Sequence, residues 1–277
     1  AMKVHTTGAK NIAIGYGAMD DTDAGSTSLG STENIFMGYD AGGGTWTNVA
    51  SNYNIGIGNN VMDAAMDGAL NNTAIGWAAA SGLTTGDQNT IIGSQAANDI
   101  TTGQNNTIIG YLAGEKITST VETVLIGAYA GTKLNSADAA GTVAIGVNAL
   151  GSATDAIRNV AIGYEAGVKL LTDDNIAIGF RAMRNIGDTA GSNHGEFNVA
   201  IGTWAIGGGD SSTVANNTGY KNIAIGYQAL GNGHSTAFTA NENVAIGHNA
   251  MNYGGNMVSS VAIGSTAGLY ATGSQNT

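Results

Sequence analysis

One short phrase recurs from end to end of this sequence, and no other feature restricts the fold as much. It reads Asn, a β-branched residue, a small residue, Ile, Gly, two variable residues and Ala, as in Asn159–Ala166. A fixed period of this size is typical of repeat proteins, in which each unit packs mainly on its neighbours. The phrase occurs in fourteen copies, spaced 16 to 24 residues apart and most often 17, and its glycines are Gly15, Gly38, Gly58, Gly76, Gly93, Gly110, Gly127, Gly146, Gly163, Gly179, Gly202, Gly226, Gly247 and Gly264.

The residue types inside the phrase predict a β-strand. Counting the Asn as position 0, every residue at position 1 is β-branched, and position 3 is Ile in every copy except Met37. β-Branched residues favour strands, and positions 1 and 3 of a strand share one face. Stacked copies would therefore form aliphatic ladders, and we predict that the core of the solenoid contains Ile14, Ile57, Ile75, Ile92, Ile109, Ile126, Ile145, Ile162, Ile178, Ile201, Ile225, Ile246 and Ile263.

Position 2 lies on the opposite face of the strand and is also apolar. It is Ala in nine copies and is never charged. A strand that is apolar on both faces is expected to be buried on both. The chain offers no second set of elements for this face, so we expect other copies of the same chain to cover it in a closed oligomer. The residues predicted for this trimer face are Phe36, Ile91, Ile108, Leu125, Ala161 and Ala224.

The remaining fixed positions predict backbone and packing features. The glycine at position 4 is expected to end the strand, either with a positive φ or by allowing another backbone to approach closely. Asn occupies position 0 in eleven copies. Stacked Asn side chains form hydrogen-bonded ladders in other repetitive β-structures, so we predict a structural ladder here. Ala at position 7 indicates a second tightly packed place in each coil.

Composition narrows the class of protein. The chain has 44 Gly, no Pro and no Cys, which fits central strands and rules out disulfides or thiolate metal sites. A net charge of −11 makes nucleic acid and anionic membranes poor partners, and no apolar run is long enough to cross a membrane. We predict a single solenoid array over residues 11–277, after a lead-in or tag remnant at 1–10. The chain ends as a new repeat would begin, so we expect a fragment of a longer fibre.

The phrase resembles the repeats of a known group of fibrous proteins. Val-Ala-Ile-Gly-x-x-Ala is similar to the head repeat of trimeric autotransporter adhesins, and it occurs at Val143–Ala149, Val160–Ala166, Val199–Ala205, Val244–Ala250 and Val261–Ala267. Asn-Thr-x-Ile-Gly, at Asn72, Asn89 and Asn106, resembles repeats of phage tail-fibre proteins. The resemblance implies an all-β, left-handed parallel β-roll of about fourteen coils, assembled as a homotrimer with an adhesive or receptor-binding role. The uneven spacing favours the phage-fibre branch.

Catalytic and metal sites are not evident in the sequence. A glycosidase needs two carboxylates across a groove, but the acidic residues here are scattered over turns and never fall at matching offsets that would place a pair on one face. We therefore predict no enzymatic activity, with a glycan-cleaving tail spike as the less favoured alternative. Asp20, Asp21 and Asp23 begin like a calcium loop but lack its glycine and glutamate spacing. We interpret them as a solvated acidic turn, with a weak calcium site as the alternative, and expect no other cofactor.

Insertions between repeats are the places where ligand contacts are expected, because solenoids carry binding loops on one flank. We predict a ligand-binding surface formed by Trp46, His194, Trp204, Asp210 and Tyr220. Many copies also carry an aromatic residue at position 5, which fits either a packed corner ladder or a sugar-stacking stripe.

These observations predict a structural and adhesive segment of an extracellular trimeric fibre. The favoured assignment is a phage tail fibre that presents receptor-binding loops, and the alternative is the head of a bacterial surface adhesin. Its partners would be two further copies of the chain and a cell-surface glycan or protein receptor, and its location would be the virion tail or the bacterial cell surface.

Overall fold

A computed structural model describes residues 8–21, 30–47, 49–135, 139–154, 156–184, 186, 195–207, 219–231, 239–253 and 257–270. The chain divides into two compact units, residues 1–140 and 141–277, and each is described by itself. Within the described residues all regular structure is β, with no helix. The single array predicted from residue 11 onward stays a prediction.

Each copy of the phrase forms one three-residue strand at positions 1 to 3. The first unit contains β1 (Ile12–Ile14), β2 (Ile35–Met37), β3 (Ile55–Ile57), β4 (Thr73–Ile75), β5 (Thr90–Ile92), β6 (Thr107–Ile109) and β7 (Val124–Ile126). The second contains β8 (Val143–Ile145), β9 (Val160–Ile162), β10 (Ile176–Ile178), β11 (Val199–Ile201), β12 (Ile223–Ile225), β13 (Val244–Ile246) and β14 (Val261–Ile263).

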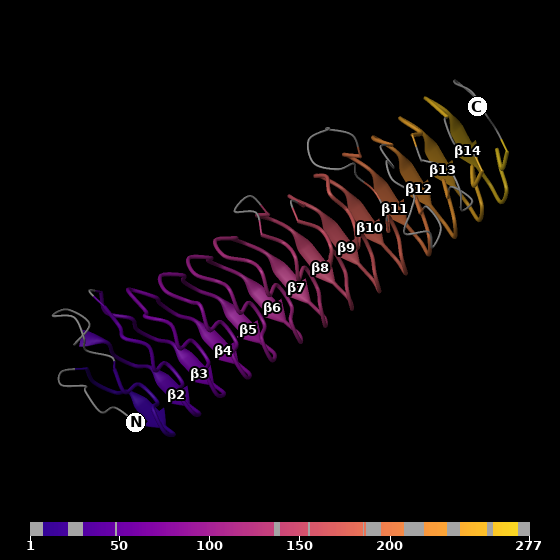
Figure 1. Cartoon of the computed structure of the whole chain (residues 1–277). Coiled ribbons are helices and arrows are strands. Elements are labelled where there is room, and N and C mark those ends of the chain that lie inside the picture. The colour runs from indigo at the N-terminus through magenta and orange to yellow at the C-terminus, as the bar shows by residue number, and fades with distance from the viewer. Residues whose placement is uncertain are drawn as a thin grey trace. The chain divides into compact units, whose positions relative to one another are not determined.

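Strands pair in parallel with their neighbours in chain order inside each unit (Figure 1). The register never slips, so that Ile91 of β5 lies beside Ile108 of β6 and position 2 always meets position 2. The predicted parallel β-solenoid is therefore confirmed, whereas its left hand stays a prediction.

Hydrogen bonds between coils continue beyond the strands. In the fourth coil, Thr73 N donates to Asn89 O, Ala80 N to Ala96 O and Gly82 N to Asn98 O, at 2.8, 3.0 and 2.9 Å. Turns as well as strands are thus joined to the next coil. This arrangement satisfies buried backbone groups without any second sheet. Because most of each coil is hydrogen-bonded to the next, additional residues in the longer repeats must loop out of the stack.

The glycine at position 4 serves both predicted purposes. Gly110, for example, has φ +145° and lies so close to the next coil that an added Cβ would be 2.3 Å from Gly127 O. Positive φ also recurs at non-glycine residues, as at Gln88, Gln95 and Ala97. These correspond to the residue before the Asn and to positions 6 and 8. Such conformations are unfavourable for L-residues, so the hydrogen bonds between coils must hold them.

Position 2 faces the interior of the coil, so the predicted trimer face is wrong. Its six members are fully buried inside a single chain: Phe36, Ile91, Ile108, Leu125, Ala161 and Ala224. The buried interior also contains the Ala at position 7, such as Ala96, and a further apolar residue in each of several coils, such as Ile100. The prediction that position 7 is tightly packed is confirmed.

The predicted core ladder at position 3 is also wrong, because these side chains point outward. Ile14 is 55% exposed and Ile225 is 37% exposed, and no member is buried. The exposed members are Ile14, Ile57, Ile75, Ile92, Ile201, Ile225 and Ile263, and the half-buried ones are Ile109, Ile126, Ile145, Ile162, Ile178 and Ile246. The physical reason is that position 2 fills the interior together with buried residues of the turns, such as Ala96 and Ile100, so positions 1 and 3 on the opposite face of each strand must point outward.

The Asn ladder is confirmed as a buried structural feature. Asn89 donates through Nδ2 to Asn72 Oδ1 and to Gly103 O, at 2.9 and 2.8 Å, and its own Oδ1 accepts from Asn106 N and Nδ2. Burial strengthens such bonds, and every group of the amide has a partner. The side chain at position 0 therefore fixes both the register between coils and the start of each strand.

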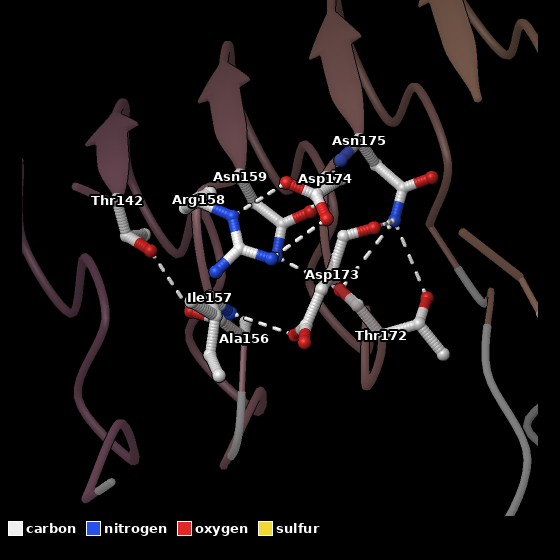
Figure 2. Close-up of polar contacts among 9 residues, drawn as sticks. All are labelled: Thr142, Ala156, Ile157, Arg158, Asn159, Thr172, Asp173, Asp174 and Asn175. Atoms are coloured by element: carbon white, nitrogen blue, oxygen red, sulfur yellow. Dashed lines mark hydrogen bonds and ion pairs between the residues drawn. The ribbon is translucent and has the colours of Figure 1, made fainter. Parts of the chain in front are cut away.

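Figure 2 shows the same ladder in the second unit. Asn159 Oδ1 accepts from Asn175 N at 2.8 Å, and Thr142 replaces the amide in the preceding coil by donating to Ala156 O at 2.8 Å. Just before these positions, Arg158 makes two hydrogen bonds to the Asp174 carboxylate at 2.7 and 2.8 Å. Those bonds from the guanidinium hold the pKa of Asp174 below its ordinary value. This exposed pair links neighbouring coils from outside.

Candidate interaction surfaces

The outward side of the strands forms a repeated and mainly apolar surface in each unit. We call the residues at positions 1 and 3 the outer strip. Its members are Ile, Val, Thr and the single Met37, so the strip carries no charge. All of its side chains are exposed or half-exposed, and among the described residues no second layer covers it. Exposed apolar patches of this extent mark interaction sites in soluble proteins.

Aromatic side chains extend the apolar surface past the glycine corner, at position 5. Rings in adjacent coils pack on each other: Tyr16 with Tyr39 at 5.6 Å, Tyr164 with Phe180 at 5.4 Å, and Tyr227 with His248 at 5.2 Å between ring centroids. The predicted corner ladder is therefore present in parts of the row. The rings remain exposed, so they are also available to a ligand.

A group of charged residues accompanies this row in the second unit. The Arg181 guanidinium lies 5.0 Å from the centroids of both Phe180 and Trp204, a cation–π arrangement. Its Nε is 2.8 Å from Glu165 Oε2, and Arg184 Nε is 3.2 Å from the same oxygen. Sequence reasoning missed these three charged residues. The sequence did contain a signal for two of them. Glu165 and Arg181 both stand at position 6, directly after the aromatic residue at position 5 of successive phrases, so stacking of the coils places them side by side.

The residues predicted to bind a ligand do not form one surface. Trp46 is fully buried and packs edge-on against Phe36 at 5.8 Å, so its assignment to a binding surface is wrong. Gly56, at position 2 of the next coil, leaves room for the Phe36 ring on which Trp46 packs, because an added Cβ there would lie 2.5 Å from that ring. The absence of a side chain at Gly56 leaves interior space for large rings.

The other predicted residues lie in the second unit. Trp204 stands at position 6 of its phrase and packs on Phe180 at 6.0 Å, so it adjoins the aromatic row at position 5. Tyr220 is half-exposed, with Lys221 Nζ 5.5 Å from its ring centroid. His194 and Asp210 lie outside the described residues.

Metal-binding arrangements are not found in the described part of the chain, where no three His, Asp or Glu side chains are grouped to hold an ion. Asp21 Oδ2 accepts a hydrogen bond from Thr45 Oγ1 at 2.5 Å, and Asp20 is half-exposed. Asp23, the third residue of the suggested calcium turn, lies outside the described residues.

Comparison with models of protein families, with curated protein sequences and with solved structures finds no match to this chain. Among the described residues, no helix has both the length and the apolar character needed to cross a lipid bilayer.

Proposed function

We propose that this chain is a structural and adhesive segment of an extracellular homotrimeric fibre. The outer strip is the observation that carries the proposal. It is apolar, uncharged and uncovered along the described strands of both units. Burying apolar surface contributes about 25 cal/mol per Å² removed from water. A strip that repeats with every coil would thus supply a strong drive to associate.

The strip favours a further copy of this chain as its partner. Its side chains recur with the spacing of parallel strands, about 4.8 Å. A partner must have the same spacing to pack against the outer strip in every coil. Another copy of the chain has this spacing because it consists of the same coils. The chain's net charge of −11 opposes close approach of copies elsewhere, but the strip itself contains no charge. Closed symmetry buries such a surface without leaving a free copy of it.

The number of copies and the biological setting come from the resemblance of the repeat phrase. Both trimeric autotransporter heads and phage tail fibres that it resembles are trimeric, and the uneven 16 to 24 residue spacing favours a phage tail fibre. In such a fibre the coils would space and present the insertions between repeats. Three copies of each weak contact would reinforce one another on a cell surface.

A lysine in the outer strip tests this proposal. Ile92→Lys adds a charge to the strip, whereas Thr85→Lys adds the same charge to an exposed turn of the same unit. Gel filtration with light scattering should show that Thr85→Lys keeps the mass of the parent assembly. Ile92→Lys should lose the trimer, as a folded monomer or as a chain that no longer folds without its partners, because burying an unpaired ammonium is costly. An Ile92→Lys chain that remains trimeric with unchanged melting would refute the proposed interface.

A further inference from the structure

In the first unit, two aromatic rings of the row at position 5 are separated by a coil with a small polar residue there. Trp77 follows β4, Ser94 follows β5 and Tyr111 follows β6. Backbone hydrogen bonds hold these positions in line. Gln95 N donates to Trp77 O at 2.8 Å, which joins the first coil to the second. Leu112 N donates to Ser94 O at 3.1 Å, which joins the second coil to the third.

The spacing of Trp77 and Tyr111 leaves room for one further ring between them. Adjacent parallel strands are about 4.8 Å apart, so residues two coils apart along the row are separated by about 10 Å. Aromatic rings in contact have centroids about 4.5–7 Å apart. Tyr16 and Tyr39, at position 5 of adjacent coils, stack at 5.6 Å. A flat ring placed over Ser94 would therefore contact one aromatic ring on each side.

We call Trp77, Ser94 and Tyr111 the ring slot, and its two walls are exposed. Trp77 is 52% exposed, and among the described residues no other ring packs on it. Tyr111 is 46% exposed and is held from its far side by Tyr129 of the following coil, at 5.4 Å between ring centroids. The side of Tyr111 that faces Ser94 is thus left open.

The groups at the base of the ring slot are polar and neutral. Within the described part of the chain, neither Ser94 Oγ nor the side-chain amide of Gln95 makes a hydrogen bond, and both residues are half-exposed. The three coils carry no charge at positions 5 and 6. Because the chain has a net charge of −11, an anionic ligand would be repelled and a neutral one is favoured.

We propose that the ring slot binds a neutral pyranose sugar of a surface glycan. This inference rests on the adhesive part of the proposed function and names its ligand class. A pyranose ring has C–H groups on its two faces, which pack against Trp77 and Tyr111, and hydroxyl groups at its edge, which hydrogen-bond to Ser94 and Gln95. A purely aromatic ligand would leave these polar groups without partners. Because the slot is open, it suits an end or branch of a large glycan rather than an enclosed small molecule.

Binding of synthetic glycopolymers to the full chain, immobilised on a sensor, tests the ligand class. Two polymers carry β-galactose or β-glucose side groups, and the control polymer carries open-chain glucitol, which has hydroxyl groups but no rigid ring. Many weak contacts reinforce one another on such polymers. At least one sugar polymer is expected to bind, and the glucitol polymer is not. Binding of neither sugar polymer, or equal binding of the glucitol polymer, would overturn the proposal.

A substitution that fills the ring slot locates the site. Ser94→Tyr places a third ring between Trp77 and Tyr111 and should reduce sugar binding at least about tenfold. The fold should be retained, because Tyr occupies position 5 in other coils. Ser265→Tyr adds the same ring at the exposed position 5 of the β14 coil, outside the slot, and should leave binding unchanged. Equal losses in the two variants, or stronger binding by Ser94→Tyr, would show that no slot holds the sugar.

Removing one wall of the ring slot is an independent test. Trp77→Ala should weaken sugar binding about tenfold, the loss expected for one aromatic contact. Tyr253→Ala removes an exposed ring from another turn, where Tyr253 stacks on Tyr270 at 5.1 Å, and should bind like the parent. Unchanged binding by Trp77→Ala would overturn the assignment even if Ser94→Tyr failed to fold.

Light scattering on the same samples separates this inference from the fibre proposal. A trimer that binds neither sugar polymer would overturn the ligand assignment and leave the fibre intact. A monomer that binds sugar, with the loss in Trp77→Ala, would overturn the fibre and leave the ring slot as a sugar site. Loss of the trimer in Trp77→Ala would place this ring in the interface between copies and overturn the slot.

Discussion

Gly110→Ala is expected to destabilise the protein severely, by roughly 2–6 kcal/mol from backbone strain and overpacking together. The added methyl would lie 2.3 Å from Gly127 O, and φ at this residue is +145°. The obstructing atom belongs to the backbone of the next coil, so no side-chain rotation relieves the contact. Thermal unfolding followed by circular dichroism measures the loss.

Gly264→Ala is the matched control for this prediction. Gly264 has nearly the same backbone, with φ +130°, but the nearest atom to an added Cβ is 3.9 Å away, in Ala267. This variant therefore isolates the conformational strain, about 1–3 kcal/mol. Equal losses in the two variants would mean that close approach between coils contributes nothing at position 4.

Asn89→Leu is the second substitution with a large expected effect. It preserves approximate size but removes the side-chain bonds of four groups. Asn72 Oδ1 keeps its bond from Asn89 N, whereas three buried groups lose their bond to this side chain: Gly103 O, Asn106 N and one N–H of Asn106 Nδ2. Each unsatisfied buried group costs about 1–3 kcal/mol, so the total is roughly 3–9 kcal/mol. Denaturant titration should show a large drop in the unfolding midpoint.

Asn89→Thr provides the comparison, because the chain itself uses Thr at this position. Thr123 Oγ1 donates to Asn106 Oδ1 at 2.8 Å, so a hydroxyl can continue one side of the ladder. The Thr variant should lose clearly less stability than the Leu variant. If both unfold at the same denaturant concentration, hydrogen bonding by Asn89 is not what stabilises the ladder.

The repeat phrase was enough to predict the strands, their stacking and the purposes of the repeated glycine and Asn. β-Branched residues at position 1 predicted strands, and each strand in the structure covers positions 1 to 3 of its phrase. The glycine and Asn predictions also hold, because each depends on a property of one residue type. In a stack of similar coils, glycine is needed where the backbone has a positive φ or approaches another coil closely. Asn can hydrogen-bond to the coils on both sides, because its amide has two donors and an acceptor.

Which face points inward could not be predicted from alternation alone. A period of two separates Ala224 from Ile225, but both are apolar, and side-chain size then suggested that Ile belongs in the core. The direction depends on how the turns close each coil, and the turns use a positive φ at residues such as Gln95 and Ala97, a conformation that no propensity for L-residues would suggest.

The candidate site was predictable only in part. Trp204 was singled out, but its partner Arg181 was not, because the two are 23 residues apart in sequence and meet through the register between coils. Trp46 was expected at the surface since it follows an insertion. It is buried against Phe36, whose ring occupies the space that a side chain at Gly56 of the following coil would fill.

The solution mass of the unmodified chain tests the central claim most directly. If the outer strip joins three copies, light scattering will give three times the chain mass of 27.6 kDa, at every concentration down to the detection limit. A single-chain mass for a folded, soluble protein would contradict the account. It would mean that the exposed Ile and Val side chains of fourteen strands remain in water without a partner.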